Sequence, residues 1–142
     1  MKYFPTFELR VEKLNLRLRF SGPDHEDWLS VHTDVSAEPF SGTYAFSMLS
    51  GELNGLLLGL QALQQSVGKQ SELAWENYEG NMRLKLSLNS RGQVAGTYQF
   101  AAGLGWEGAN LSGEFRADQS YLPGWIQQIS QVQSELGIKR RR

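Results

Sequence analysis

A chain of 142 residues, of which 40% are hydrophobic and 20% charged, can bury one sizeable core, and its composition excludes fibrous and disordered classes. It contains no cysteine, which excludes a disulfide framework, a thiolate metal site and a cysteine nucleophile. The net charge is −1, and it becomes −5 when the four positive charges of Lys139–Arg142 are set aside. The acidic body lacks the basic footprint of a nucleic-acid-binding domain.

The chain predicts one α+β domain over residues 1–138, followed by a solvated basic C-terminal tail over residues 139–142. No apolar run reaches the length of a membrane span, and the N-terminus lacks the pattern of a signal peptide. We therefore predict a cytoplasmic protein that makes no contact with a membrane.

The first half of the chain predicts four strands and then a helix. Alternating apolar and polar residues indicate strands, which span Tyr3–Val11, Leu14–Phe20, Trp28–Val35 and Phe40–Met48. Ser50 is the predicted N-cap of the helix. Its apolar stripe consists of Leu53, Leu56, Leu57, Leu60 and Leu63. Gly55 and Gly59 lie four residues apart in this helix, and we expect them to allow its close approach to a sheet.

The same order of elements returns in the second half. The predicted strands are Leu73–Asn77, Met82–Leu88, Val94–Phe100 and Leu111–Phe115. Asn89–Gly92 is typical of a hairpin connection, with Gly92 where a positive φ is needed. Asp118 can cap the first turn of the last helix. The apolar stripe of that helix is Leu122, Trp125, Ile126, Ile129, Val132 and Leu136.

These segments predict an α+β fold, with about eight mostly antiparallel strands in a curled sheet or sandwich and two amphipathic helices. The order could reflect two ββββα halves. Ser41–Phe46 (SGTYAF) echoes Ala95–Phe100 (AGTYQF), although the two segments precede their helices at different distances. Internal duplication and chance similarity between amphipathic strands both explain this echo.

No residue pattern predicts catalysis. His25 and His32 match no metal-binding spacing, and no serine lies in a nucleophile elbow, so we predict no catalytic, metal-binding or cofactor-binding residue. Arg17 and Arg19 lie on the polar face of a predicted strand. They could bind phosphate, but a solvated face that pairs with acids on a neighbouring strand is the simpler interpretation.

Acidic residues next to aromatic residues in predicted turns are the best candidates for a functional site. They form three clusters: Glu26, Asp27 and Trp28; Glu76, Tyr78 and Glu79; and Trp106 and Glu107. Tyr and Trp side chains flanked by acids suit an interface that anchors a basic partner. The alternative is that each aromatic ring packs over the edge of the core while the acids are merely solvated.

The segments from Trp28 through the Ser50–Leu63 helix, the Met82–Leu88 strand, Arg91–Val94 (RGQV) and Glu114–Ile129 carry a family resemblance. In the order of these segments and in their pattern of apolar and polar residues, the chain resembles the WapI-type immunity proteins of bacterial polymorphic-toxin systems. The resemblance implies a non-enzymatic protein that binds and neutralises a cognate toxin domain, often a nuclease, whose basic surface an acidic body would cover.

An alternative from another class is a small-ligand-binding β-barrel or sandwich, with aromatic and glycine-rich loops around its mouth. The sequence predicts neither the toxin nor the oligomeric state.

Overall fold

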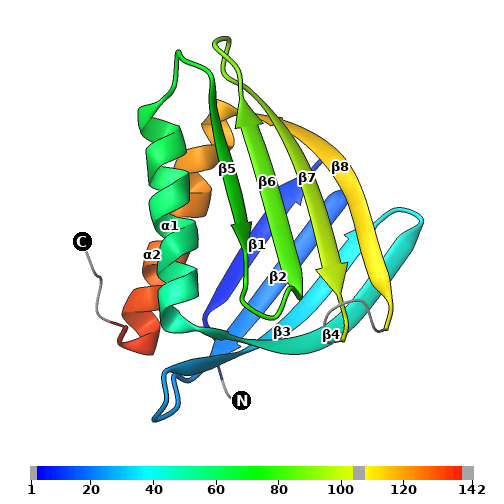
Figure 1. Ribbon diagram of the computed structural model, residues 1–142, viewed down its shortest axis with the longest axis vertical. Helices are drawn as coiled ribbons and strands as arrows, with labels where there is room; N and C mark the ends of the chain where they lie inside the picture. The colour runs from blue at the N-terminus through cyan, green and yellow to red at the C-terminus, as the bar shows by residue number, and fades with distance from the viewer. Residues whose placement is uncertain (1–2, 104–107, 139–142) are drawn as a thin grey trace.

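The computed structural model describes residues 3–103 and 108–138, and there the chain forms four strands and a helix twice (Figure 1). The first half contains β1 (Thr6–Val11), β2 (Leu14–Ser21), β3 (Trp28–Ala37), β4 (Phe40–Leu49) and α1 (Ser50–Gln65). The second contains β5 (Ser71–Glu76), β6 (Met82–Leu88), β7 (Gln93–Ala101), β8 (Asn110–Asp118), the 3₁₀ turn η1 (Gln119–Tyr121) and α2 (Leu122–Leu136). The α+β prediction with two ββββα halves is confirmed.

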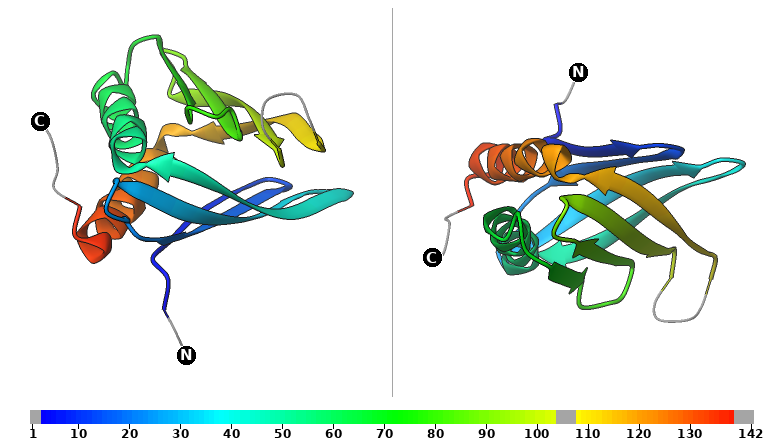
Figure 2. Two further views of the ribbon diagram at one scale, coloured as in Figure 1. Left: turned by 60° about the horizontal axis from the view of Figure 1, so that its bottom comes forward. Right: turned by 90° about the horizontal axis from the view of Figure 1, so that it is seen from above.

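Each half contributes one antiparallel sheet. Sheet A has the strand order β1-β2-β3-β4, and sheet B has the order β5-β6-β7-β8. The sheets converge at the paired helices α1 and α2 and diverge away from them as a wedge (Figure 2). Over the residues that the structure describes, the sheets do not close, so the barrel form of the ligand-binding alternative is wrong.

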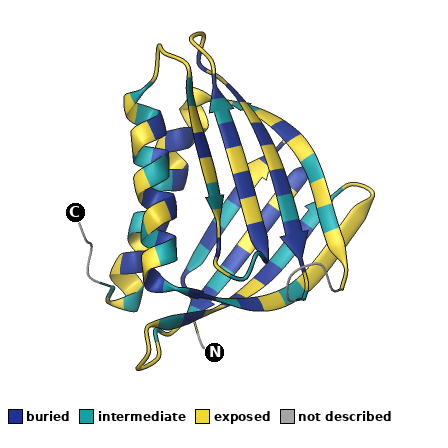
Figure 3. Ribbon diagram, in the orientation of Figure 1, coloured by how far each residue is buried: buried dark blue, intermediate teal, exposed yellow. Residues whose placement is uncertain are grey.

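Burial follows the periods of the sequence, with buried and exposed residues alternating along β6 and β7 (Figure 3). All five leucines of the α1 stripe are buried. In α2, Leu122, Trp125, Ile129 and Val132 are buried, while Ile126 and Leu136 are half-buried. Phe40 begins the alternating apolar residues of the predicted Phe40–Met48 strand, which would place it on the core face with Phe46 and Met48, but it is 65% exposed because the first half of β4 lies at the open end of the wedge.

The start of α1 also differs from the prediction. Ser50 is the first helical residue and not the N-cap, which is Leu49. The Leu49 N–H donates to Glu52 Oε2 at 2.6 Å, while the Ser50 hydroxyl donates to Asp27 Oδ2 at 2.5 Å. Asp118 does act as a cap, accepting from Ser120 N at 2.8 Å in the 3₁₀ turn that leads into α2.

Two interpretations of local sequence are confirmed. A Cβ atom at Gly59 would overlap the Leu73 side chain, so this glycine does let α1 approach β5 closely, whereas a Cβ atom at Gly55 would meet only Trp75 Nε1 at 3.9 Å, an ordinary contact. On the outer face of sheet A, Arg17 Nε lies 3.0 Å from Glu8 Oε1 and Arg19 Nη2 lies 3.4 Å from Asp34 Oδ2. These arginines therefore pair with acids on neighbouring strands.

The two similar segments, Ser41–Phe46 and Ala95–Phe100, lie in strands that are not equivalent. β4 is the fourth strand of sheet A, and β7 is the third strand of sheet B. In β7, Gly96 faces Phe115 of β8 and Tyr98 faces Gly113. A Cβ atom at either glycine would overlap the facing aromatic side chain. The glycines of this pattern therefore make room for aromatic rings across the strand pair.

Gly96→Ala should lower the free energy of unfolding by about 1–3 kcal/mol, because the new methyl group overlaps the buried Phe115 ring. Gly42→Ala is the matched control in β4, since no described atom lies within 4 Å of its Cβ position. Urea denaturation measures both values. Equal losses in the two variants would contradict the close packing between Gly96 and Phe115.

Candidate functional site

The two acidic clusters that the structure describes lie at the same place, the N-terminus of α1. Asp27 accepts from Ser50 twice, at its Oδ2 from the hydroxyl (2.5 Å) and at its backbone oxygen from the amide (3.1 Å). On the other side, the Tyr78 N–H donates to Glu52 Oε1. We call this surface the α1 rim and define it as Asp24–Trp28, Ser50–Glu52 and Trp75–Glu79.

The β2–β3 loop is held in shape by Asp24. Its Oδ1 accepts from Glu26 N and Trp28 N, both at 2.9 Å, and its own N–H donates to the Trp28 carbonyl at 3.0 Å. The backbone N–H of Trp28, and that of Glu26, lower the pKa of the Asp24 carboxyl group. Glu26 and Asp27 are exposed, and Trp28 is half-buried.

The order of this loop should depend on pH through Asp24. A folded-state pKa below the ordinary 3.8 means that ionised Asp24 favours the folded loop above that pH, and that this contribution disappears as the pH falls through the lowered value. In an NMR titration, the amide resonances of Glu26 and Trp28 should therefore shift together with a midpoint below 3.8. A midpoint at or above 3.8 would contradict the Asp24 hydrogen bonds.

The β5–β6 turn is anchored by Asn77, which is fully buried. Its Oδ1 accepts from Met82 N at 2.9 Å, and its backbone oxygen accepts from Gly80 N at 2.9 Å. Trp75 Nε1 donates to the Glu52 carbonyl at 2.8 Å, which ties the end of β5 to α1. The turn is thus fixed from within and from the helix.

Asn81, which is also buried, fixes the other side of this turn. Its Nδ2 donates to the Ala101 and Gly103 carbonyls at 3.1 and 2.9 Å, and its own carbonyl accepts from the Tyr44 hydroxyl at 2.8 Å. In contrast, the Tyr78 side chain is 86% exposed. The structure therefore presents an aromatic ring to solvent from a turn that is bonded to both sheets and to α1.

The α1 rim is acidic because few of its carboxylates are neutralised. Glu76 pairs with Arg83 at 2.8 Å, and Glu26 lies 3.3 Å from the His25 ring. Among the described residues, Asp27, Glu52 and Glu79 have no ion pair. Trp106 and Glu107, the third predicted cluster, lie outside the described residues.

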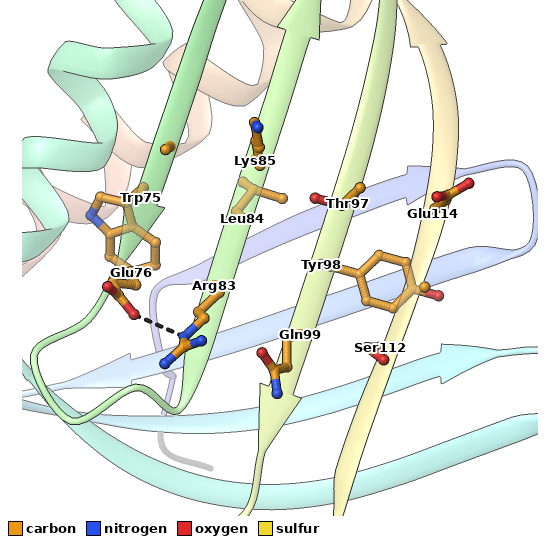
Figure 4. Close-up of a pocket in the computed structure, with 12 residues that line it drawn as sticks. Trp75, Glu76, Arg83, Leu84, Lys85, Thr97, Tyr98, Gln99, Ser112 and Glu114 are labelled. Atoms are coloured by element: carbon orange, nitrogen blue, oxygen red, sulfur yellow. Dashed lines mark ion pairs between the residues drawn. The ribbon is translucent and has the colours of Figure 1, made fainter. Parts of the chain in front are cut away.

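Two hollows bear on the ligand-binding alternative. An open groove of about 650 Å³ crosses the polar face of sheet B, with the Glu76–Arg83 pair at one end (Figure 4). A smaller hollow of about 290 Å³ lies between the β1–β2 turn, the β3–β4 turn and β8, with Phe40 and Leu111 in its lining. No group of three His, Asp or Glu residues in the described ranges is arranged to hold a metal ion.

A family model, the immunity protein WapI-like family, matches residues 5–137. The chain belongs to that family. Membership confirms the resemblance seen in the sequence, indicates an immunity function and points to a non-enzymatic role. None of the helices among the described residues is long and apolar enough to cross a membrane.

Comparison with curated proteins gives no match. Among solved structures, Trypanosoma bruciei MRP1/MRP2 has a TM-score of 0.50 at 8% identity, over 96% of this chain and 88% of that one. The plant transcriptional regulator PBF-2 has a TM-score of 0.46 at 10% identity, over 96% of this chain and 84% of that one. WHY1 from Arabidopsis thaliana has a TM-score of 0.45 at 13% identity, over 96% of this chain and 93% of that one. The likeness to MRP1/MRP2 shows the fold alone.

Sequence reasoning missed the residues that assemble the α1 rim. Glu52 is recognisable in the sequence only as an acid in the first turn of a predicted helix, yet its carboxylate accepts from the Leu49 amide and from the Tyr78 amide of the β5–β6 turn. Asn77 and Asn81 look like ordinary turn residues in the sequence, but both are buried. The spacing N-x-x-x-N around an exposed aromatic residue was the available signal, and it does not reveal which carbonyl groups the amides reach.

Proposed function

We propose that this protein neutralises a cognate bacterial toxin domain by binding it, without catalysis, through the α1 rim. Family membership supports the immunity role. The observation that carries the choice of surface is that the fold brings two distant acidic clusters to one helix end, next to the exposed Tyr78. Binding there would cover the active surface of the toxin.

The partner should present a basic surface. Glu26, Asp27, Glu76 and Glu79 all belong to the α1 rim. Opposite potentials would accelerate encounter, while a few desolvated aromatic residues would set the dissociation rate. A nuclease suits this chemistry, because a surface that attracts phosphate is positively charged. The acidic rim would occupy that surface itself and needs no contact with nucleic acid.

Co-expression with the toxin domain encoded beside this chain tests the proposal. We expect the wild type to restore growth and to co-purify with the toxin, whereas Asp27→Lys combined with Glu79→Lys should weaken both. Glu38→Lys, at the exposed β3–β4 turn, is the control with an added positive charge away from the rim, since the whole length of β4 separates this turn from α1. A wild-type chain that neither binds nor protects would contradict the function, and protection that survives the rim variants would contradict the surface.

The hollow between the sheets favours a second candidate, a module that binds a small apolar ligand. Leu14 and Phe115 contribute to its lining. A thermal-shift screen against small apolar ligands, repeated with Leu111→Lys, tests this candidate. Stabilisation of the wild type that disappears in the variant would support it, and no stabilisation by any ligand would count against it.

A further inference from the structure

Side chains or a helix cover at least part of three of the four sheet edges. In β1, the Gln128 side chain accepts from the Glu8 amide at 2.7 Å and donates to its carbonyl at 2.9 Å. In β8, Glu12 Oε1 accepts from the Arg116 amide at 2.7 Å. The short strand β5 packs along α1 (Figure 1). Helix cover and side chains that cap an edge are common ways to prevent strand addition.

The fourth edge, β4, is protected only in the half next to α1. There, Asn77 Nδ2 reaches the Ser47 carbonyl at 3.5 Å, and the Leu49 amide donates to Glu52. These two contacts show that odd-numbered residues of β4 turn their backbone groups away from β3. By the same alternation, Ser41, Thr43 and Ala45 direct their N–H and C=O groups to the open edge.

We call residues Phe40–Ala45 the β4 edge segment. In the part of the chain that the structure describes, the backbone groups of Ser41, Thr43 and Ala45 on this edge have no hydrogen-bond partner. The segment has no charged residue, and all of it except Tyr44 is exposed, as the end of β4 shows in Figure 3. An uncharged, exposed edge strand of this length is a ready template for pairing.

The sequence echo indicates what pairs there. In sheet B, the G-x-Y pattern of β7 faces the G-x-F pattern of β8, so each glycine lies opposite an aromatic residue. The β4 edge segment carries the same G-x-Y pattern at Gly42 and Tyr44, but it has no neighbouring strand on its open side. No described atom lies within 4 Å of a Cβ position at Gly42, which leaves space for a side chain from such a neighbour.

We propose that the β4 edge segment pairs antiparallel with the same segment of a second copy of this chain, with Thr43 on the two-fold axis. This register places Gly42 opposite Tyr44 of the second copy and Ser41 opposite Ala45. It reproduces the glycine–aromatic pairing of β7 and β8 and uses all the open backbone groups of the edge. Because the segment is uncharged, the self-pairing brings no like charges together, whereas a basic toxin would find no acid in it to bind.

Sedimentation of the full chain between about 1 μM and about 500 μM tests this proposal, because a self-pairing population rises with concentration. The mass should rise from 16.0 kDa toward twice that value. In the proposed dimer, Thr43→Lys places the lysines of the two copies opposite each other. Gly42→Val fills the space that would receive Tyr44 of the second copy. Both variants should remain at 16.0 kDa. The melting temperature of Gly42→Val should be unchanged, because no described atom lies within 4 Å of the Cβ position at Gly42, whereas Thr43→Lys also removes the 3.0 Å hydrogen bond from the Thr43 hydroxyl to Asp34 Oδ1.

Ser30→Lys is the matched control, since it adds a lysine to an exposed position on β3, an interior strand of the same sheet. It should dimerise like the wild type. A wild-type mass of 16.0 kDa over the whole range would overturn the proposal, as would a dimer that survives both edge variants. A monomeric wild type whose toxin complex is weakened by Gly42→Val would also overturn it, and would assign the edge to a strand of the toxin.

Discussion

Leu57→Ala and Ile129→Ala are each expected to lower the free energy of unfolding by about 2–5 kcal/mol. Leu57 is 2% exposed and Ile129 is 1% exposed, in the two helices that pack against each other where the sheets converge. Truncating either side chain removes apolar contacts and leaves a cavity that the two sheets and the neighbouring helix restrain from collapsing.

Leu58→Ala is the control for these core variants, because Leu58 lies in the same helix but is 46% exposed. Its loss should be much smaller than that of Leu57→Ala. Chemical denaturation of the three variants gives the comparison. Losses below about half a kcal/mol at both core sites would show that the helices do not close the wedge.

Tyr78→Ala is expected to weaken toxin binding by about 2 kcal/mol or more, which corresponds to roughly a 30-fold rise in Kd. The turn that carries Tyr78 is already fixed by buried Asn77 and Asn81 and by Glu52. Little conformational entropy is therefore lost when the turn binds the partner. The free energy gained by burying the Tyr78 ring is not offset by such a loss.

Tyr121→Ala provides the control for Tyr78. Tyr121 is also exposed (39%), but it stacks on Trp125 near the start of α2, away from the α1 rim. Isothermal titration with the toxin domain should show a large change in Kd for Tyr78→Ala and little change for Tyr121→Ala. Similar values for Tyr78→Ala and the wild type would remove Tyr78 from the proposed interface.

The sequence predicts the helices and strands well because buried residues in this fold recur at the spacing of a helix or of a strand. The leucine stripe of α1 repeats every three or four residues, and every member is buried. The alternation from Met82 to Leu88 likewise matches the observed strand. Phe40 continues the alternation of β4 and is nevertheless exposed, because periodicity defines a face of a strand and not how far the opposite sheet extends over it.

The clusters Asp24–Trp28 and Trp75–Glu79 were visible in the sequence as separate turns. Their meeting at α1 depends on how the two sheets join the helices, and on single hydrogen bonds from Ser50 and to Glu52. Local patterns contain no information about such contacts between distant segments. The same holds for the open edge of β4, whose pattern could be seen but whose missing neighbour could not.

The most direct test of the acidic α1 rim is a salt titration of toxin association. For the wild type, the association rate should fall steeply as ionic strength rises, because exposed opposite charges are screened. Charge reversal of Glu26, Asp27, Glu76 and Glu79 should lower the rate at low salt and flatten its salt dependence, while Glu38→Lys, at the far end of β4, should leave both nearly unchanged. Tight binding that is indifferent to salt and to all four reversals would contradict recognition of a basic toxin by this surface.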